Sequence, residues 1–184
     1  MPADFEEYDR TEVIDGVEYQ MSPPNMSHVV IRGNIESIFR QYLKGKRCRA
    51  FSEAGLYLEN GFLIPDVMIV CDRDKIKADG IHGAPDLVVE ILSPSTGKKD
   101  RSVKLKTYEK AGVKEYWIVS PKAKSVEVYK LQDGHYELDE LYHSLSQEEW
   151  DMMDEKDRKK MKLSLKVSLY DDLEISLRDI FEDL

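Results

Sequence analysis

Apolar residues in the middle of the chain switch between strand-like and helical spacing. Three apolar runs, at 49–58, 62–70 and 85–92, are bounded by turn-forming residues, which is typical of strands. A fourth run at 115–119 follows a stretch of helical spacing over 100–111. Before the first run, a helix beginning near Ser27 is predicted by apolar residues three and four positions apart, namely Ile31, Ile35, Ile38, Phe39 and Tyr42.

The predicted order of elements is helix, three strands, helix, strand. The first three strands form an antiparallel meander, with Asn60-Gly61 as the first turn and a loop over residues 71–84 as the second connection. The helix over 100–111 is long enough to carry the chain to a fourth strand that runs parallel to the third. Two further hairpins are indicated by Asp15-Gly16 and Asp133-Gly134.

We therefore predict an α/β fold in a single domain that spans residues 1–184. Its core covers about residues 10–142, including the hairpin added after the fourth strand. An acidic extension over 143–184 contains a helical insertion, because Ser146 can cap an amphipathic helix over 146–160.

Two of the apolar runs contain acidic residues, which are costly to bury without a partner. If the second and third strands pair about a loop centred near residue 78, Asp66 lies opposite Glu90, with Cβ atoms about 5 Å apart. Two carboxylates this close repel one another unless a cation lies between them. Oxygen ligands suit Mg²⁺ or Mn²⁺, and the backbone carbonyl of Ile91 could supply another.

Asp86 is the second aspartate that follows a proline, but it is a poorer candidate. It lies on the same strand as Glu90 and four residues away, so roughly 13 Å separates them, too far for one shared ion. We take Asp66 as the metal ligand and Asp86 as a strand-start residue. A simpler interpretation stays open, in which Asp66 also ends a turn and Glu90 forms an ordinary salt bridge.

A site that cleaves phosphodiesters also needs a cation near the attacking water or the developing phosphorane charge. Leu92, the next residue on the Glu90 face of the strand, cannot serve. Lys104 can reach back from the following helix, where Tyr108 lies one turn further along the same face. Lys98 and Lys106 are alternatives, and Lys104 could instead be one more exposed lysine.

Together these residues resemble the Uma-type family of restriction endonucleases, within the PD-(D/E)XK nuclease superfamily. The likeness covers about residues 10–142. It implies a restriction-endonuclease-like core, a divalent metal and phosphodiester hydrolysis, with Leu92 standing where the superfamily usually has its lysine. Its segments are Ile14 to Pro23, Ile64 to Val67, Pro85 to Thr96, and Asp100 to Val119. The site implied is Asp66 and Glu90, with Lys104 in the position from which this family supplies the lysine.

The net charge of −9 gives no support for strong non-specific DNA binding. The excess is local, however, because residues 137–184 carry fifteen acidic and seven basic side chains. Residues 98–114 are basic, and Lys98, Lys99 and Arg101 could contact a DNA backbone. We expect a metal-dependent endonuclease acting on DNA, and a homodimer, since cutting two strands favours two sites. The alternative is an inactive nuclease-fold module that binds nucleic acid or protein.

The remaining features concern the protein's environment. Cys48 and Cys71 are distant in sequence and lack a metal-binding spacing, which argues against both a disulfide and a zinc site. The first residues are acidic and lack an apolar run, so no signal peptide is expected. No window is long and apolar enough for a membrane span, and we expect a cytoplasmic protein with no membrane partner.

Overall fold

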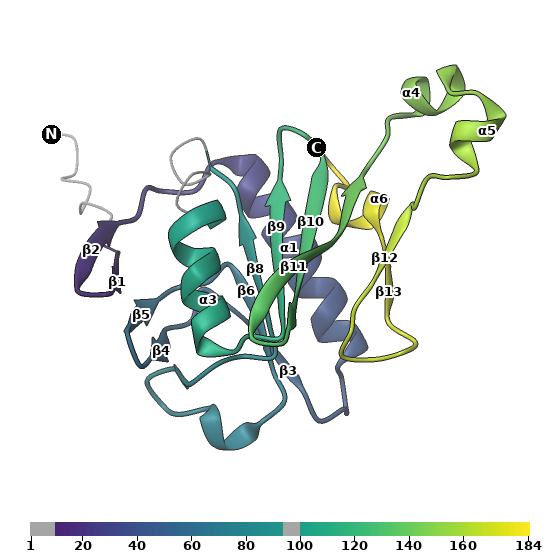
Figure 1. Cartoon of the computed structure of the whole chain (residues 1–184). Coiled ribbons are helices and arrows are strands. Elements are labelled where there is room, and N and C mark those ends of the chain that lie inside the picture. The colour runs from purple at the N-terminus through teal and green to yellow at the C-terminus, as the bar shows by residue number, and fades with distance from the viewer. Residues whose placement is uncertain (1–9, 94–99) are drawn as a thin grey trace, which may run out of the picture.

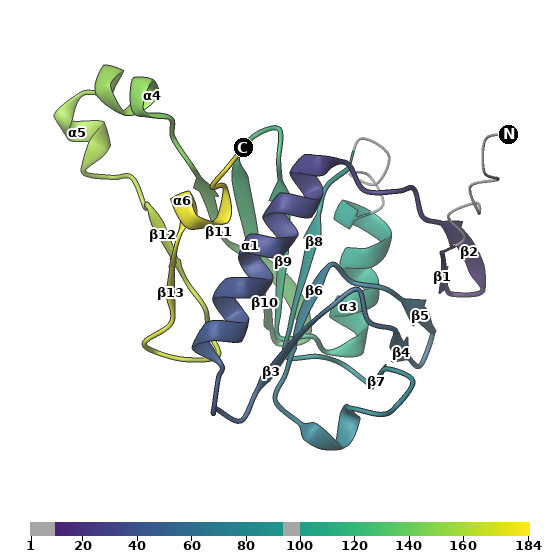
Figure 2. The ribbon, with the colours of Figure 1, turned by 180° about the vertical axis from the view of Figure 1, so that it is seen from behind.

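The computed structural model describes residues 10–93 and 100–184. A mixed six-stranded sheet forms its centre, with α1 (Met26–Tyr42) on one face and α3 (Leu105–Ala111) on the other (Figures 1 and 2). In their order across the sheet the strands are β11 (His135–His143), β10 (Ser125–Gln132), β9 (Glu115–Ser120), β8 (Leu87–Ile91), β6 (Val67–Val70) and β3 (Arg49–Ser52).

Apolar residues occupy most positions of the central strands, as expected where helices cover both faces of the sheet. Successive side chains of β6 point to opposite faces, as strand geometry requires. Val67 and Ile69 join the apolar core on the α1 side, whereas Met68 and Val70 join a second core that includes Tyr108 of α3. The continuous apolar runs in the sequence therefore reflect two cores that share one sheet.

The strand pairing confirms the predicted meander and crossover. β3 pairs antiparallel with β6, and β6 pairs antiparallel with β8 in a register that sets Val67 opposite Val89. This is the register centred near residue 78. β9 lies parallel to β8, with Val89 opposite Trp117, and α3 carries the chain between these two strands. β10 and β11 extend the sheet as the predicted hairpin around Asp133-Gly134.

A second, smaller sheet was not predicted. Its five strands, in spatial order, are β2 (Val17–Gln20), β1 (Thr11–Ile14), β5 (Gly61–Leu63), β4 (Leu56–Leu58) and β7 (Ile81–His82). The single strands predicted over 49–58 and 62–70 are therefore wrong, because each is two strands in different sheets. Glu53, in left-handed conformation, and Pro65, which lacks an N–H, mark the two breaks.

The turn between β4 and β5 also differs from the prediction. Leu58 is opposite Gly61, so the turn residues are Glu59 and Asn60, and Gly61 is the first residue of β5. A Cβ added to Gly61 would lie 2.1 Å from the carbonyl oxygen of Val13 on the neighbouring strand β1. Glycine is needed there for close strand approach rather than for the turn.

The second helix spans residues 100–111 as predicted, whereas the first helix is capped by a different residue from the one predicted. α1 is capped by Asn25, whose side chain accepts a hydrogen bond from the His28 N–H at 2.9 Å, and not by Ser27. The second helix opens with a π-helical turn, η2 (Asp100–Lys104), and ends at Gly112, whose φ of +84° is the left-handed cap expected of glycine. A short 3₁₀ turn, η1 (Arg73–Lys75), lies in the connection before β7.

The insertion forms two short helices, α4 (Gln147–Met152) and α5 (Glu155–Arg158), rather than one helix over 146–160. The predicted cap at Ser146 is present as a capping box with Glu149. Figure 1 shows both helices projecting away from the main sheet, and neither has a buried residue. The chain then returns through β12 (Ser164–Lys166), β13 (Glu174–Ser176) and α6 (Leu177–Ile180).

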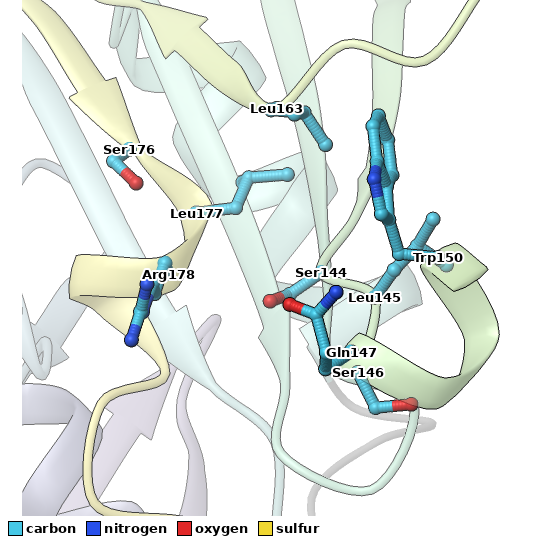
Figure 3. A pocket seen from close by; sticks show the side chains of 9 residues that line it. All are labelled: Ser144, Leu145, Ser146, Gln147, Trp150, Leu163, Ser176, Leu177 and Arg178. Atoms are coloured by element: carbon cyan, nitrogen blue, oxygen red, sulfur yellow. The ribbon is translucent and has the colours of Figure 1, made fainter. Parts of the chain in front are cut away.

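We call the projecting segment that contains α4 and α5 the arm. A surface pocket of about 290 Å³ lies where this arm meets the body of the protein. Figure 3 shows Trp150 and Leu163 on the arm side, across from Leu177 and Arg178 at the start of α6. Across residues 10–93 and 100–184, no helix has the length and apolar character that crossing a membrane requires.

The expectation that the cysteines are unpaired is wrong. Cys48 and Cys71 form a disulfide. Arg49 pairs with Val70 in the β3–β6 ladder, so the next pair outward brings residues 48 and 71 side by side. The two cysteines are therefore cross-strand neighbours, although 23 positions separate them in the sequence.

We expect reduction of this disulfide to destabilise the protein by about 3 kcal/mol, because it closes a loop with a sequence separation of 23 residues. Urea unfolding with and without reductant measures the loss, and Cys71→Ser should reproduce it. A thiol assay on the denatured, unreduced protein should find no free thiol. Two titratable thiols per chain would contradict the disulfide.

Candidate metal and catalytic site

The strand register brings Asp66 and Glu90 to one end of the main sheet. Asp66 immediately precedes β6 and Glu90 lies in β8, so extending the Val67–Val89 pairing by one step places them opposite each other. Directly opposed residues share a face of the sheet. Both side chains line one narrow cavity of about 50 Å³, together with Glu12, His28, Glu53, Asp100 and Lys104 among its polar residues.

Asp66 is held at both carboxylate oxygens. Its Oδ2 accepts the backbone N–H of Ile91 at 2.6 Å, and its Oδ1 lies 3.1 Å from Nε2 of His28. His28 lies in the first turn of α1, so the start of this helix is directed at the end of the sheet. These contacts leave the Asp66 carboxylate little rotational freedom.

Glu90 is buried, with 4% of its surface exposed. One oxygen, Oε1, accepts hydrogen bonds from Lys104 Nζ at 2.9 Å and from the Tyr108 hydroxyl at 2.6 Å. Burial raises the pKa of Glu90 to about 8; the Lys104 charge opposes this rise, while Asp66, Asp100 and Glu12 add to it. Glu90 therefore lies in surroundings that favour either a proton or another cation.

Lys104 is only 3% exposed, so the interpretation of Lys104 as an exposed lysine is wrong. Its Nζ lies 2.9 Å from Glu90 Oε1 and 2.8 Å from Glu12 Oε1. Burial disfavours the charged ammonium, but the carboxylates of Glu90, Glu12 and Asp100 outweigh burial and raise the pKa of Lys104. The alternative Lys106 is exposed, and Lys98 and Lys99 lie outside the described residues.

Sequence reasoning missed two buried acidic residues of this cavity. Glu12 comes from the N-terminal hairpin and Asp100 from the π-helical turn, and both are buried. A signal for Glu12 was present, because Glu12 shares a strand face with Ile14 and so had to point inward. The structure also places His28 against Asp66.

Asp86 lies at the other end of β8. It accepts hydrogen bonds from the Cys71 N–H and from Lys114 Nζ, each at 2.8 Å. Asp86 therefore stabilises the strand ends beside the disulfide and does not line the Asp66 cavity.

The cavity's donors fit a hard divalent cation with open positions. Among the described residues, no group of three or more Asp, Glu, His or Cys side chains is placed to hold a metal ion, so a cation here would depend on fewer side chains. Two carboxylates, a backbone carbonyl and water would complete such a site in the way Mg²⁺ prefers. Ile91 suits this role, since N–H and C=O of an extended residue point to one side of the strand, and its N–H faces Asp66.

The fold defines the class of protein. It is similar to the crystal structure of a putative nuclease of the DUF820 group from Anabaena variabilis, with a TM-score of 0.72 over 96% of this chain and 92% of that chain. The two sequences are 23% identical, a level at which the likeness establishes the fold. The chain therefore has the same mixed α/β fold as that structure, in agreement with the predicted α/β class.

The family follows from the sequence comparison. The model of the Uma2 family, described as "Putative restriction endonuclease", matches residues 1–155, and the chain belongs to this family. A protein of Synechocystis sp., named only "Uncharacterized protein slr1290", is 31% identical over 133 residues, which is 70% of each chain.

We expect the metal-free protein to lose stability between about pH 5 and pH 8 as Glu90 titrates. In this window the folded protein holds a proton, with a Glu90 pKa of about 8, that the unfolded chain has released near the ordinary value of 4.5. Raising the pH then favours the unfolded state by at most about 1.4 kcal/mol per pH unit. Urea unfolding in EDTA at several pH values measures the slope. Glu90→Gln should flatten it, and an unchanged slope would contradict this assignment.

Proposed function

We propose that the protein is a Mg²⁺- or Mn²⁺-dependent endonuclease that hydrolyses phosphodiester bonds in DNA. The observation that carries this proposal is the buried pair of opposed carboxylates, Asp66 and Glu90, with the Lys104 ammonium 2.9 Å from Glu90. Membership of a family described as putative restriction endonucleases supports the same reaction class.

Asp66, Glu90 and the Ile91 carbonyl would hold the cation, which supplies Lewis-acid stabilisation of the phosphate and a more acidic bound water. The chain's own groups keep the ligands in place. His28 and the Ile91 N–H fix Asp66, and the Tyr108 hydroxyl fixes Glu90. Lys104 donates hydrogen bonds to the attacking water or to the phosphorane oxygens, where a buried cation is most effective.

A larger cavity beside the site suits an anionic strand. It has a volume of about 560 Å³, and its lining includes hydroxyls and two cationic residues, Arg101 and Lys122. Ser93 lines both cavities, so the two are adjacent at that residue. Ser27, at the start of α1, lies on the same wall, where helix N–H groups favour negative charge. Among the residues that the structure describes, this lining contains no acidic side chain, in contrast to the neighbouring cavity, so we infer that the DNA backbone approaches from this side.

A second candidate function is a nuclease-fold module that binds nucleic acid or protein without cleaving. Leu92 is half-buried against the core on the α3 side and cannot replace the strand lysine of the superfamily. This candidate predicts salt-dependent DNA binding with no metal-dependent turnover.

A homodimer remains a prediction for the active form, and light scattering with and without DNA measures it.

We expect Asp66→Asn and Glu90→Gln each to lower DNA cleavage in Mg²⁺ or Mn²⁺ by more than about 100-fold. Loss of a residue that hydrogen-bonds to a metal ligand typically lowers metal affinity or activity by about 10–100-fold, and loss of a ligand itself should lower activity further. Cleavage of plasmid DNA over time provides the measurement, with EDTA abolishing wild-type activity.

Asp86→Asn is the matched control, because Asp86, like Asp66, follows a proline and immediately precedes a strand. Asp86 lies at the start of β8, however, at the opposite end of that strand from Glu90. The cleavage activity of Asp86→Asn should stay close to that of the wild type at temperatures where a thermal unfolding curve shows that the variant is folded. Wild-type cleavage rates in Asp66→Asn or Glu90→Gln would rule out the proposed site.

Lys122→Gln should weaken DNA binding and reduce the salt dependence by about one counterion, because one phosphate contact is lost. Fluorescence anisotropy with a labelled duplex at several salt concentrations, in EDTA, measures both effects. Lys44→Gln is the control, since Lys44 is exposed beyond the far end of the 17-residue helix α1, about 25 Å away. Equal effects of the two variants would argue against a strand path through this cavity.

A further inference from the structure

Glu12 is a fully buried acid, 0% exposed, that reaches the site from a part of the chain outside the main sheet. It lies on β1, between the outward-facing Thr11 and Val13, on the same face as the buried Ile14. The β1–β5 pairing of Val13 with Phe62 places Glu12 next to Leu63. The N-terminal hairpin therefore directs one carboxylate at the end of the main sheet.

One oxygen of this carboxylate joins two parts of the site. Glu12 Oε1 accepts the backbone N–H of Ile64 at 3.1 Å and lies 2.8 Å from Lys104 Nζ. Ile64 is two residues before Asp66, on the connection from β5 to β6. Glu12 thus links the segment that carries Asp66 to the π-helical turn that carries Lys104.

The lysine needs this second partner because its first partner is shared. Glu90 Oε1 accepts from both Lys104 and Tyr108, and the proposed function also assigns Glu90 to the metal. A buried ammonium that loses its carboxylate partner is strongly unfavourable. Glu12 is not assigned to the metal, so it can keep Lys104 in place while Glu90 turns to a cation.

We propose that Glu12 is a positioning residue of this site, which holds the Lys104 ammonium beside Glu90 through its charge. The inference rests on the proposed nuclease function. It makes the N-terminal hairpin a necessary part of the site rather than an accessory to the fold.

Glu12→Gln tests the role of the charge, because glutamine keeps the size of the side chain and an oxygen that can accept from the Ile64 N–H. We expect a fall of about 10–100-fold in the single-turnover cleavage rate, as for other outer partners of a metal site. The Mn²⁺ affinity, measured by calorimetry, should remain close to wild type. Glu18→Gln, at an exposed position of the same hairpin, is the matched control and should cleave at the wild-type rate.

A double-mutant cycle separates positioning from a merely structural role. If Glu12 acts through Lys104, Glu12→Gln combined with Lys104→Gln should cleave no more slowly than Lys104→Gln alone. Additive losses would overturn the proposal. Wild-type cleavage in Glu12→Gln would also overturn it, and loss of Mn²⁺ binding would make Glu12 a ligand instead.

A measurement without cleavage keeps the inference distinct from the nuclease proposal. Reductive methylation followed by peptide mass spectrometry reports how accessible each lysine amine is. Lys104 should resist labelling in the wild type and in Glu18→Gln, and become labelled in folded Glu12→Gln. Protection that persists in Glu12→Gln overturns the positioning role. If wild type does not cleave DNA in either metal while this labelling change occurs, only the nuclease proposal fails.

Discussion

The burial of one ammonium group among carboxylates is the constraint on which this structure depends. Lys104 is removed from water, and an isolated charge there would be prohibitively costly. Its partners come from separate parts of the chain, Glu90 from the centre of the main sheet and Glu12 from the N-terminal hairpin. Satisfying this charge therefore requires the helix, the main sheet and the small sheet to be assembled together. Because an acidic excess remains around Lys104, the same arrangement that stabilises the lysine also favours an added cation.

The position of the site follows from how the sheet is covered. Over most of their length β6 and β8 are buried on both faces, and their side chains have apolar neighbours. The apolar cover ends where β6 begins and β8 finishes, so polar side chains can converge there. Asp66 and Glu90 occupy this end, and α1 starts beside them with His28. At the opposite end of the same strands, Asp86 accepts a hydrogen bond from the Cys71 N–H, and Cys71 forms the disulfide with Cys48. These contacts stabilise the fold and do not reach the site.

The local sequence pattern was sufficient to predict contacts between residues that are close in sequence or related by simple strand geometry. The centre of the loop between β6 and β8 was enough to pair residue 66 with residue 90, because an antiparallel register has a constant sum of residue numbers. Pattern failed where a strand leaves one sheet for another, since apolar residues continue through the break at Pro65. It also failed for Glu12, whose partner Lys104 is 92 residues away and is determined by packing of the hairpin. Cys48 and Cys71 were misjudged for another reason, because their spacing in the sequence was judged without extending the strand pairing that makes them cross-strand neighbours.

The origin of the lysine has a physical consequence for the site. A lysine at position 92, on the Glu90 strand, would be oriented by the sheet itself. Here Leu92 packs towards the α3 core, and the ammonium comes instead from a π-helical turn. A turn that precedes a helix is less rigid than a central strand, and a long side chain has many rotamers to lose. Two carboxyl oxygens at 2.8 and 2.9 Å compensate for that freedom. A helix-borne lysine thus needs an additional carboxylate, and the N-terminal hairpin is the element that provides it.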